Sequence, residues 1–150
     1  MTLLLPTIAA IGLLTTTGPV TWSFTSAPGD NGTFLIDVTA QVEKGWHLYA
    51  TELPSDEGPI ATSFRFTPSS DFQVVGTLSE PKPVERYDEN FGMTVRYHSG
   101  NPHFILTVLP KANGPFTVEG EVEFMVCNDR TCLPPTVVPI SVRVEPLVKQ

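Results

Sequence analysis

The chain has 150 residues, of which 41% are hydrophobic and 17% charged, and its formal net charge is −7. This is the length of one ordinary domain, with enough apolar side chains for a core. The acidic balance excludes a nucleic-acid binder, because a polyanion would be repelled.

The first segment, residues 1–17, is apolar and then rich in threonine. Its apolar part has about the length of a signal-peptide hydrophobic region and is too short to cross a bilayer. No Lys or Arg precedes Lys44, so the basic region that opens a signal peptide is missing. We expect residues 1–17 to be the remnant of a secretory signal peptide or a disordered leader, with a first β-strand as the alternative.

The rest of the chain alternates between apolar runs and turns, and most of its fifteen prolines and eleven glycines lie between those runs. Apolar and polar residues alternate with period two, which is typical of half-buried strands. The predicted strands are residues 20–25, 33–43, 46–50, 60–67, 72–76, 93–98, 103–109, 116–126 and 136–144. With no convincing helix, this pattern predicts an all-β, immunoglobulin-like antiparallel β-sandwich over residues 18–146. Residues 147–150 are expected to begin a linker or tail.

Residues 77–92, TLSEPKPVERYDENFG, interrupt the strand pattern. The segment is long, charged and contains proline, and Tyr87 and Phe91 are its aromatic residues. Long irregular loops in compact domains are often functional. We therefore predict an irregular functional loop here.

The two cysteines, Cys127 and Cys132, enclose four polar residues after a predicted strand. The ends of such a hairpin lie about 4.5–5.5 Å apart at Cα, and a disulfide needs about 4.4–6.8 Å. Closing so short a loop contributes only roughly 2 kcal/mol, against about 4.7 kcal/mol for a 100-residue loop. A bridge that stabilises little but is accessible on a turn favours thiol–disulfide exchange.

Two other interpretations of the cysteines remain open. One is a plain structural hairpin disulfide. The other is half of a metal site, which would need further ligands. His47, His98 and His103 show no ligand spacing with the cysteines, so we expect no metal.

Three blocks make the chain resemble the N-terminal periplasmic domain of the bacterial thiol:disulfide interchange protein DsbD. The blocks are residues 45–49 (GWHLY), 87–92 (YDENFG) and 127–135 (CNDRTCLPP). They occur in the family's order, and the resemblance covers about residues 20–145. It implies an immunoglobulin-like fold with a redox pair, Cys127 and Cys132, on a hairpin near one end.

The resemblance also implies a cap loop that covers the disulfide until a partner displaces it. Phe91 matches the aromatic tip of this loop, Asp88 and Glu89 match its acidic neighbours, and Asn90 and Gly92 belong to the same block.

His47 and Tyr49 match two tyrosines that line the family's site, so His47 is a departure. The turn between the cysteines is one residue shorter than in the best-known members. By the same resemblance, Cys132 attacks the partner and Cys127 resolves the mixed disulfide; the residues alone do not decide between them.

The implied function is that of a protein-disulfide reductase domain in a Gram-negative periplasm, working without a cofactor. Electrons would arrive from a thioredoxin-like or membrane-embedded partner, or from a fused domain, and leave to periplasmic oxidoreductases, including those of cytochrome c biogenesis. No nucleic acid or small-molecule substrate is expected. The alternatives are a non-catalytic immunoglobulin-like binding module with a structural disulfide, and a copper or zinc carrier.

Overall fold

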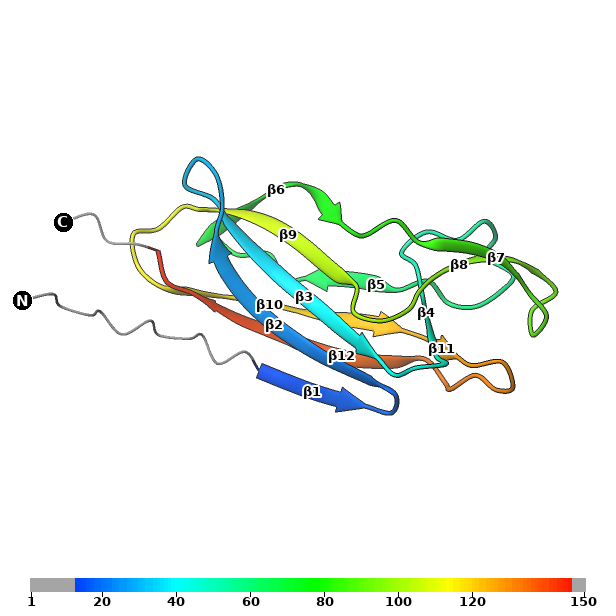
Figure 1. Ribbon diagram of the computed structural model, residues 1–150. Helices are drawn as coiled ribbons and strands as arrows, with labels where there is room; N and C mark the ends of the chain where they lie inside the picture. The colour runs from blue at the N-terminus through cyan, green and yellow to red at the C-terminus, as the bar shows by residue number, and fades with distance from the viewer. Residues whose placement is uncertain (1–12, 147–150) are drawn as a thin grey trace, which may run out of the picture.

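The computed structural model describes residues 13–146, which form strands joined by turns and loops (Figure 1). Every strand pairing is antiparallel. No helix long and apolar enough to cross a membrane occurs in residues 13–146.

The largest sheet has five strands in the order β1-β2-β3-β9-β6. Its strands are β1 (Leu13–Thr17), β2 (Val20–Pro28), β3 (Phe34–Val42), β9 (His103–Pro110) and β6 (Phe72–Ser79).

A three-stranded sheet, in the order β12-β10-β5, covers the inner face of the five-stranded sheet. It contains β12 (Thr136–Val144), β10 (Phe116–Phe124) and β5 (Ser63–Phe66). The two sheets make the sandwich.

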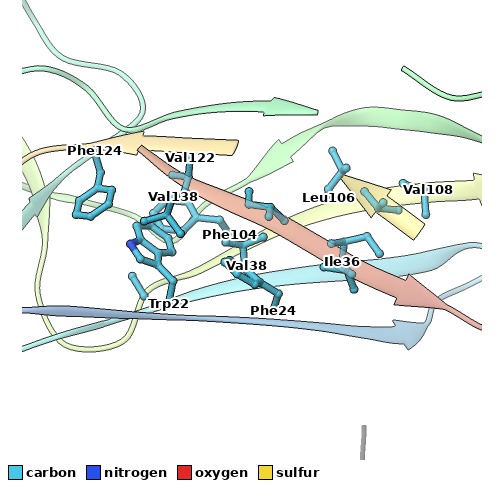
Figure 2. Close-up of a cluster of buried hydrophobic side chains, with 14 of the residues drawn as sticks. Trp22, Phe24, Ile36, Val38, Phe104, Leu106, Val108, Val122, Phe124 and Val138 are labelled. Atoms are coloured by element: carbon cyan, nitrogen blue, oxygen red, sulfur yellow. The ribbon is translucent and has the colours of Figure 1, made fainter. Parts of the chain in front are cut away.

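Side chains that alternate along the strands fill the space between the two sheets (Figure 2). In β3 the predicted inner face is confirmed, since every second side chain from Phe34 to Val42 is buried. Trp22 lies at the centre with no exposed surface, and its ring is 5.2 Å from that of Phe124 and 6.2 Å from that of Phe104. An aromatic side chain buries about 150–250 Å² of surface, so Trp22 contributes much of the core's hydrophobic stabilisation.

A third, four-stranded sheet in the order β11-β4-β8-β7 lies at one end of the sandwich, at the right of Figure 1. It contains β11 (Val126–Cys127), β4 (His47–Tyr49), β8 (Met93–His98) and β7 (Val84–Asp88).

The two faces of this end sheet have different surroundings, because successive strand residues point to opposite faces. Leu48 and its ladder partner Val126 belong to the sandwich core. Their neighbours Tyr49 and Cys127 belong to a second, separate hydrophobic cluster. The end sheet therefore joins the core to the cysteines.

The structure differs from the sequence predictions at two places. Residues 13–17, expected in a leader with a first β-strand as the alternative, form β1 and pair with β2. Residues 1–12 and 147–150 lie outside the described residues. Within residues 77–92, β6 extends to Ser79 and β7 pairs with β8, so the irregular part is shorter than predicted. Strand β7 is almost wholly exposed, and an exposed edge strand carries no apolar alternation to detect.

Candidate functional site

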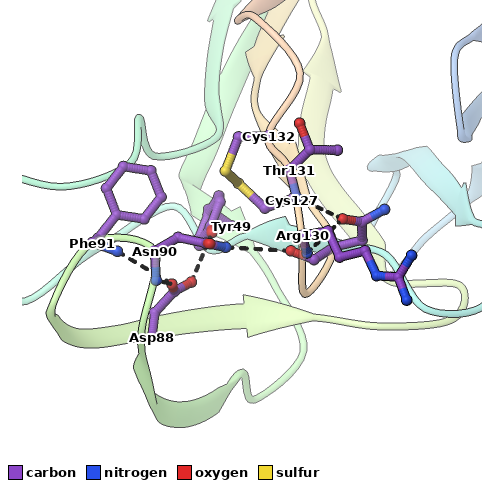
Figure 3. Close-up of a disulfide and its surroundings, with 9 residues drawn as sticks. Tyr49, Asp88, Asn90, Phe91, Cys127, Arg130, Thr131 and Cys132 are labelled. Carbon is purple, nitrogen blue, oxygen red and sulfur yellow. Dashed lines mark hydrogen bonds between the residues drawn. A yellow bond between two sulfur atoms is a disulfide. The ribbon is translucent and has the colours of Figure 1, made fainter.

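The cysteines form a disulfide across a tight turn, residues 128–131, which we call the cysteine turn. Their Cα atoms lie 4.0 Å apart, closer than the predicted 4.5–5.5 Å. The Asn128 side-chain oxygen accepts hydrogen bonds from the backbone N–H groups of Arg130 at 2.9 Å and Thr131 at 2.8 Å (Figure 3). Asn128 N also donates to Thr131 O at 2.9 Å. These three bonds hold the turn narrow enough for the sulfurs to meet.

The two cysteines differ in exposure. Cys127 is only 2% exposed because it ends β11 and pairs with β4 on its other side. Cys132 is partly exposed and lies between the cysteine turn and β12, outside the named strands. An incoming thiolate therefore has easier access to Cys132.

The disulfide is part of the second hydrophobic cluster, which we call the site cluster. Its buried members and the partly buried residues packed on them are Tyr49, Val95, Tyr97, Cys127, Leu53, Phe91, Met93, Met125 and Cys132. The Phe91 ring meets Tyr49 edge-on, with centroids 6.2 Å apart and an interplanar angle of 89°. The structure thus brings Phe91, Tyr49 and both cysteines together (Figure 3).

Asp88 organises the turn of the β7–β8 hairpin, residues 89–92, which we call the cap tip. Its Oδ1 accepts from Asn90 N at 2.7 Å and from Phe91 N at 3.4 Å. Its Oδ2 accepts from the Tyr49 hydroxyl at 3.1 Å. Asn90 Nδ2 donates to the backbone oxygen of Asn128 at 3.3 Å, so the cap tip is also bonded to the cysteine turn (Figure 3).

Gly92 closes the cap tip in the left-handed region, with φ of 63°, and its N–H donates to Asp88 O at 2.8 Å. Glycine adopts this conformation without the steric cost that other residues incur. Glu89 is exposed at the cap tip.

Burial raises the pKa of Tyr49 well above 10, and the charge of Asp88 and the hydrogen bond to it act in the same direction. The Tyr49 hydroxyl therefore keeps its proton and stays a donor to Asp88 at physiological pH.

His47 lies on the same face of β4 as Tyr49, and its ring stacks on Tyr97 with centroids 4.0 Å apart. Burial lowers the pKa of His47 below 6.5; Arg86 acts in the same direction, and Asp129 and Asp88 oppose it.

An open pocket of about 290 Å³ lies beside the cysteine turn, between β4, β8 and the β7–β8 hairpin. His47, Tyr97, Asp88, Glu89 and Asp129 are among the residues that line it.

The sequence matches, over residues 17–142, the family described as "Thiol:disulfide interchange protein DsbD, N-terminal". The chain belongs to this family. A comparison with curated proteins finds no match.

Three solved structures of similar fold come from two bacteria. The N-terminal periplasmic domain of ScsB from Proteus mirabilis has a TM-score of 0.60 and 16% identity, and the match covers 88% of this chain and 49% of that one. The present chain thus spans about half the length of that structure.

The DsbD N-terminal domain of Neisseria meningitidis in the reduced form has a TM-score of 0.50 and 18% identity, over 81% of this chain and 87% of that one. A complex of the DsbD and PilB N-terminal domains from the same bacterium has a TM-score of 0.52 and 16% identity. That match covers 79% of this chain and 80% of the other. These similarities support the fold, and the predicted immunoglobulin-like sandwich is confirmed.

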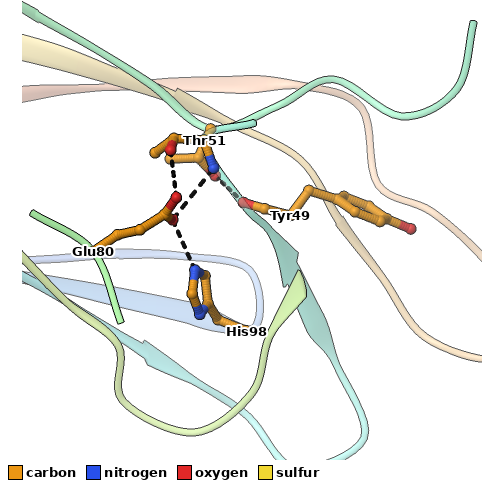
Figure 4. Close-up of polar contacts among 5 residues, drawn as sticks. Tyr49, Thr51, Glu80 and His98 are labelled. Carbon is orange, nitrogen blue, oxygen red and sulfur yellow. Dashed lines mark hydrogen bonds and ion pairs between the residues drawn. The ribbon is translucent and has the colours of Figure 1, made fainter. Parts of the chain in front are cut away.

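One buried polar network of this DsbD-family domain was missed from the sequence (Figure 4). Glu80, directly after β6 in the connection to β7, accepts from the Thr51 N–H and hydroxyl. It lies 2.9 Å from His98 Nε2, and the His98 side chain is 4% exposed. The Thr62 hydroxyl donates to Tyr49 O at 2.6 Å nearby. In the sequence His98 shows no ligand spacing with the cysteines, and no spacing links it to Glu80 either.

Chemically, the DsbD-family site offers a reducible bond on a short hairpin. Within residues 13–146 there is no group of three or more His, Cys, Asp or Glu side chains that could hold a metal ion. The disulfide is the group in this site that can accept and release electrons.

Proposed function

We propose that this chain is a periplasmic protein-disulfide reductase domain whose Cys127–Cys132 pair cycles between dithiol and disulfide. It takes electrons from a thioredoxin-like or membrane-embedded partner and gives them to periplasmic oxidoreductases. The observation that carries the proposal is a disulfide in a short turn, with Cys132 partly exposed beneath the cap tip, in a member of the DsbD N-terminal family. Because β1 is part of the sheet, the exchange domain includes residues 13–17.

The chemistry follows from the different exposure of the two cysteines. In the reduced domain, the Cys132 thiolate attacks one sulfur of the partner's disulfide, and the other partner sulfur leaves as a thiolate. The Cys127 thiolate then attacks Cys132 Sγ, which restores the internal disulfide and releases the partner's second thiolate. Two electrons have moved from the domain to the partner, and the reverse sequence reloads the domain.

The cap tip would control access to this chemistry. Phe91 packs on the site cluster, and Asp88 and Asn90 bond the tip to Tyr49 and to the cysteine turn. A docking partner replaces these few contacts with its own, so a free domain stays closed and a bound one opens.

A trapping experiment tests the proposal. The Cys127→Ala variant keeps Cys132 and cannot resolve. It should therefore accumulate a mixed disulfide with a thioredoxin-like protein that lacks its own resolving cysteine and whose attacking cysteine is activated as a disulfide with thionitrobenzoate, which leaves as its thiolate. Non-reducing gel electrophoresis and mass spectrometry measure the adduct. Cys132→Ala should give much less adduct, because Cys127 is buried, and the double variant gives the background.

Two outcomes would contradict the proposal. No adduct from either single variant excludes exchange, and equal adducts contradict the preference for Cys132 over Cys127 as the attacking residue. A redox titration adds an independent check, since a reduction potential below about −300 mV would favour the structural disulfide of a non-catalytic binding module.

A further inference from the structure

His47 and the two cysteines lie in one row across the end of the molecule. In the β4–β11 ladder Cys127 is directly opposite His47, and on its other side it is bridged to Cys132. Side chains directly opposite each other in an antiparallel ladder share a face and have Cβ atoms about 4.5–5.5 Å apart. When the disulfide opens, the Cys127 thiol therefore has His47 as its lateral neighbour.

The other histidines have polar partners, whereas no hydrogen bond from residues 13–146 engages the ring nitrogens of His47. His98 lies 2.9 Å from Glu80, and His103 lies 3.0 Å from Asp37. The His47 ring is instead held by stacking on Tyr97 and faces the open pocket. Its nitrogens are free to take part in proton transfer.

The other titratable groups around His47 are less suited to accept a proton from Cys127. Tyr49 stays protonated, and its hydroxyl donates a hydrogen bond to Asp88. The Asp88 carboxylate already accepts from Tyr49 and from two backbone N–H groups. The remaining charged groups at the pocket are Arg86 and Glu89 on the hairpin and Asp129 on the cysteine turn, all of them exposed.

We propose that His47 accepts the proton of the Cys127 thiol in the step that resolves the mixed disulfide. The inference rests on the proposed function. The S–H proton moves to the imidazole, the Cys127 thiolate attacks Cys132 Sγ, and the partner's sulfur leaves as a thiolate. That thiolate then takes the proton from the imidazolium, so protons and electrons balance.

A base at this position has a clear use. A buried thiol ionises less readily than an exposed one, and only the thiolate attacks. Burial keeps the pKa of His47 below 6.5, so the ring is neutral at neutral pH and ready to accept a proton.

The test uses the reduced chain and oxidised glutathione as the model partner. Glutathione adds to Cys132 and is then expelled by Cys127, and acid quenching followed by mass spectrometry gives the lifetime of the glutathione adduct. His47→Phe keeps a ring to stack on Tyr97 and removes the base, so the adduct should live roughly a hundredfold longer. His103→Phe is the matched control, because His103 lies on β9, remote from the cysteines. This variant should behave as the wild type.

The pH profile separates a proton acceptor from a ring that only packs. In the wild type, the rate of resolution should rise with pH until His47 is deprotonated and then stay constant. The inflection of this profile should lie below pH 6.5. In His47→Phe it should keep rising through neutral pH, because the thiolate fraction of Cys127 alone then sets the rate. Since Asp129 raises the pKa of His47, Asp129→Asn should move the wild-type inflection to lower pH.

Equal adduct lifetimes in the wild type and in His47→Phe overturn the proposal, including lifetimes too short to detect in both. The proposed function then still stands. If glutathione neither adds to nor oxidises the reduced wild type, exchange itself fails and this inference fails with it.

Discussion

Asp88 divides its two carboxylate oxygens between two tasks. One oxygen shapes the cap tip through the N–H groups of Asn90 and Phe91, and the other receives the Tyr49 hydroxyl from the neighbouring strand. The same side chain thus builds the tip and attaches it to the site cluster. A carboxylate suits this position because both of its oxygens accept.

Replacing Asp88 should loosen the cap tip. Asp88→Asn keeps one accepting oxygen and replaces the other with an NH₂ group, so it cannot serve both sets of donors. A hydrogen bond to a charged group contributes about 1.5–3 kcal/mol, which corresponds to at least tenfold in an opening equilibrium. We therefore expect dithiothreitol to reduce the disulfide roughly tenfold faster.

Two further variants separate the hydrogen bond from the charge. Tyr49→Phe removes the same bond and leaves the Asp88 charge, so it should accelerate reduction to a similar degree. Asp71→Asn makes the same change at an exposed carboxylate before β6, remote from the site, and should leave the rate of reduction unchanged. An unchanged rate in both Asp88→Asn and Tyr49→Phe would show that neither group holds the tip.

The β7–β8 hairpin is an exposed arm that needs an anchor at its base. Strand β7 is the outer strand of the end sheet and is almost wholly exposed. Glu80, which precedes it, is bonded to Thr51 just after β4 and lies beside the buried ring of His98 on β8. The base of the arm is therefore tied to the strand that carries Tyr49.

Removing Glu80 should free the arm without unfolding the sandwich. Glu80→Ala leaves the buried His98 ring and the Thr51 N–H without their acceptor, which costs about 1–3 kcal/mol. Hydrogen exchange of the β7 and β8 amides should accelerate accordingly, while exchange in β2 and β3 stays slow.

The matched control is Glu85→Ala, since the ion pair of Glu85 with Arg96 is exposed and such pairs contribute at most about 1 kcal/mol. Exchange that rises equally in both variants would contradict the anchor.

Elements with one buried face were predictable from the sequence. Strand β8 was predicted at residues 93–98 and β12 at residues 136–144, both with the observed bounds, and β3 to within a residue at each end, because their side chains alternate between core and solvent. Strands β1 and β7 are mostly exposed and present no such alternation. Their pairing depends on neighbours distant in sequence.

The residues of the candidate site were named from the sequence, but their contacts were not. Resemblance to the family grouped Asp88, Phe91 and the cysteines. It could not reveal how the oxygens of Asp88 are shared, or that His47 is directly opposite Cys127, because both depend on how three elements pack together. Glu80 carried no signal, since its partners belong to other strands.

The sandwich core and the site cluster are separate hydrophobic groups. The core spans both large sheets, whereas the site cluster rests on one face of the end sheet. Most of the free energy of unfolding therefore comes from residues that take no part in exchange, and the disulfide closes too short a loop to contribute much.

Unfolding in urea should show this difference. Replacing both cysteines with serine should lower the free energy of unfolding by about 2 kcal/mol at most. Trp22→Ala, at the centre of the core, should lower it by about 3–5 kcal/mol and leave the reactivity of the disulfide unchanged. Trp22→Phe should cost less than Trp22→Ala, because the phenyl ring leaves a smaller cavity than the alanine methyl group. Neither variant loses a hydrogen bond, since Trp22 Nε1 has no partner among residues 13–146. A larger loss from the serine variant than from Trp22→Ala would make the bridge a structural disulfide.

The alternation of faces in the end sheet also bears on how this part of the chain can change length during evolution. Leu48 faces the core and His47 and Tyr49 face the cysteines, so inserting one residue into β4 would exchange the two sets. The same holds for Val126 and Cys127 in β11. The cysteine turn lies beyond the paired residues and has no such constraint. Insertions and deletions should therefore accumulate between Cys127 and Cys132, while β4 keeps its length even as its side chains vary.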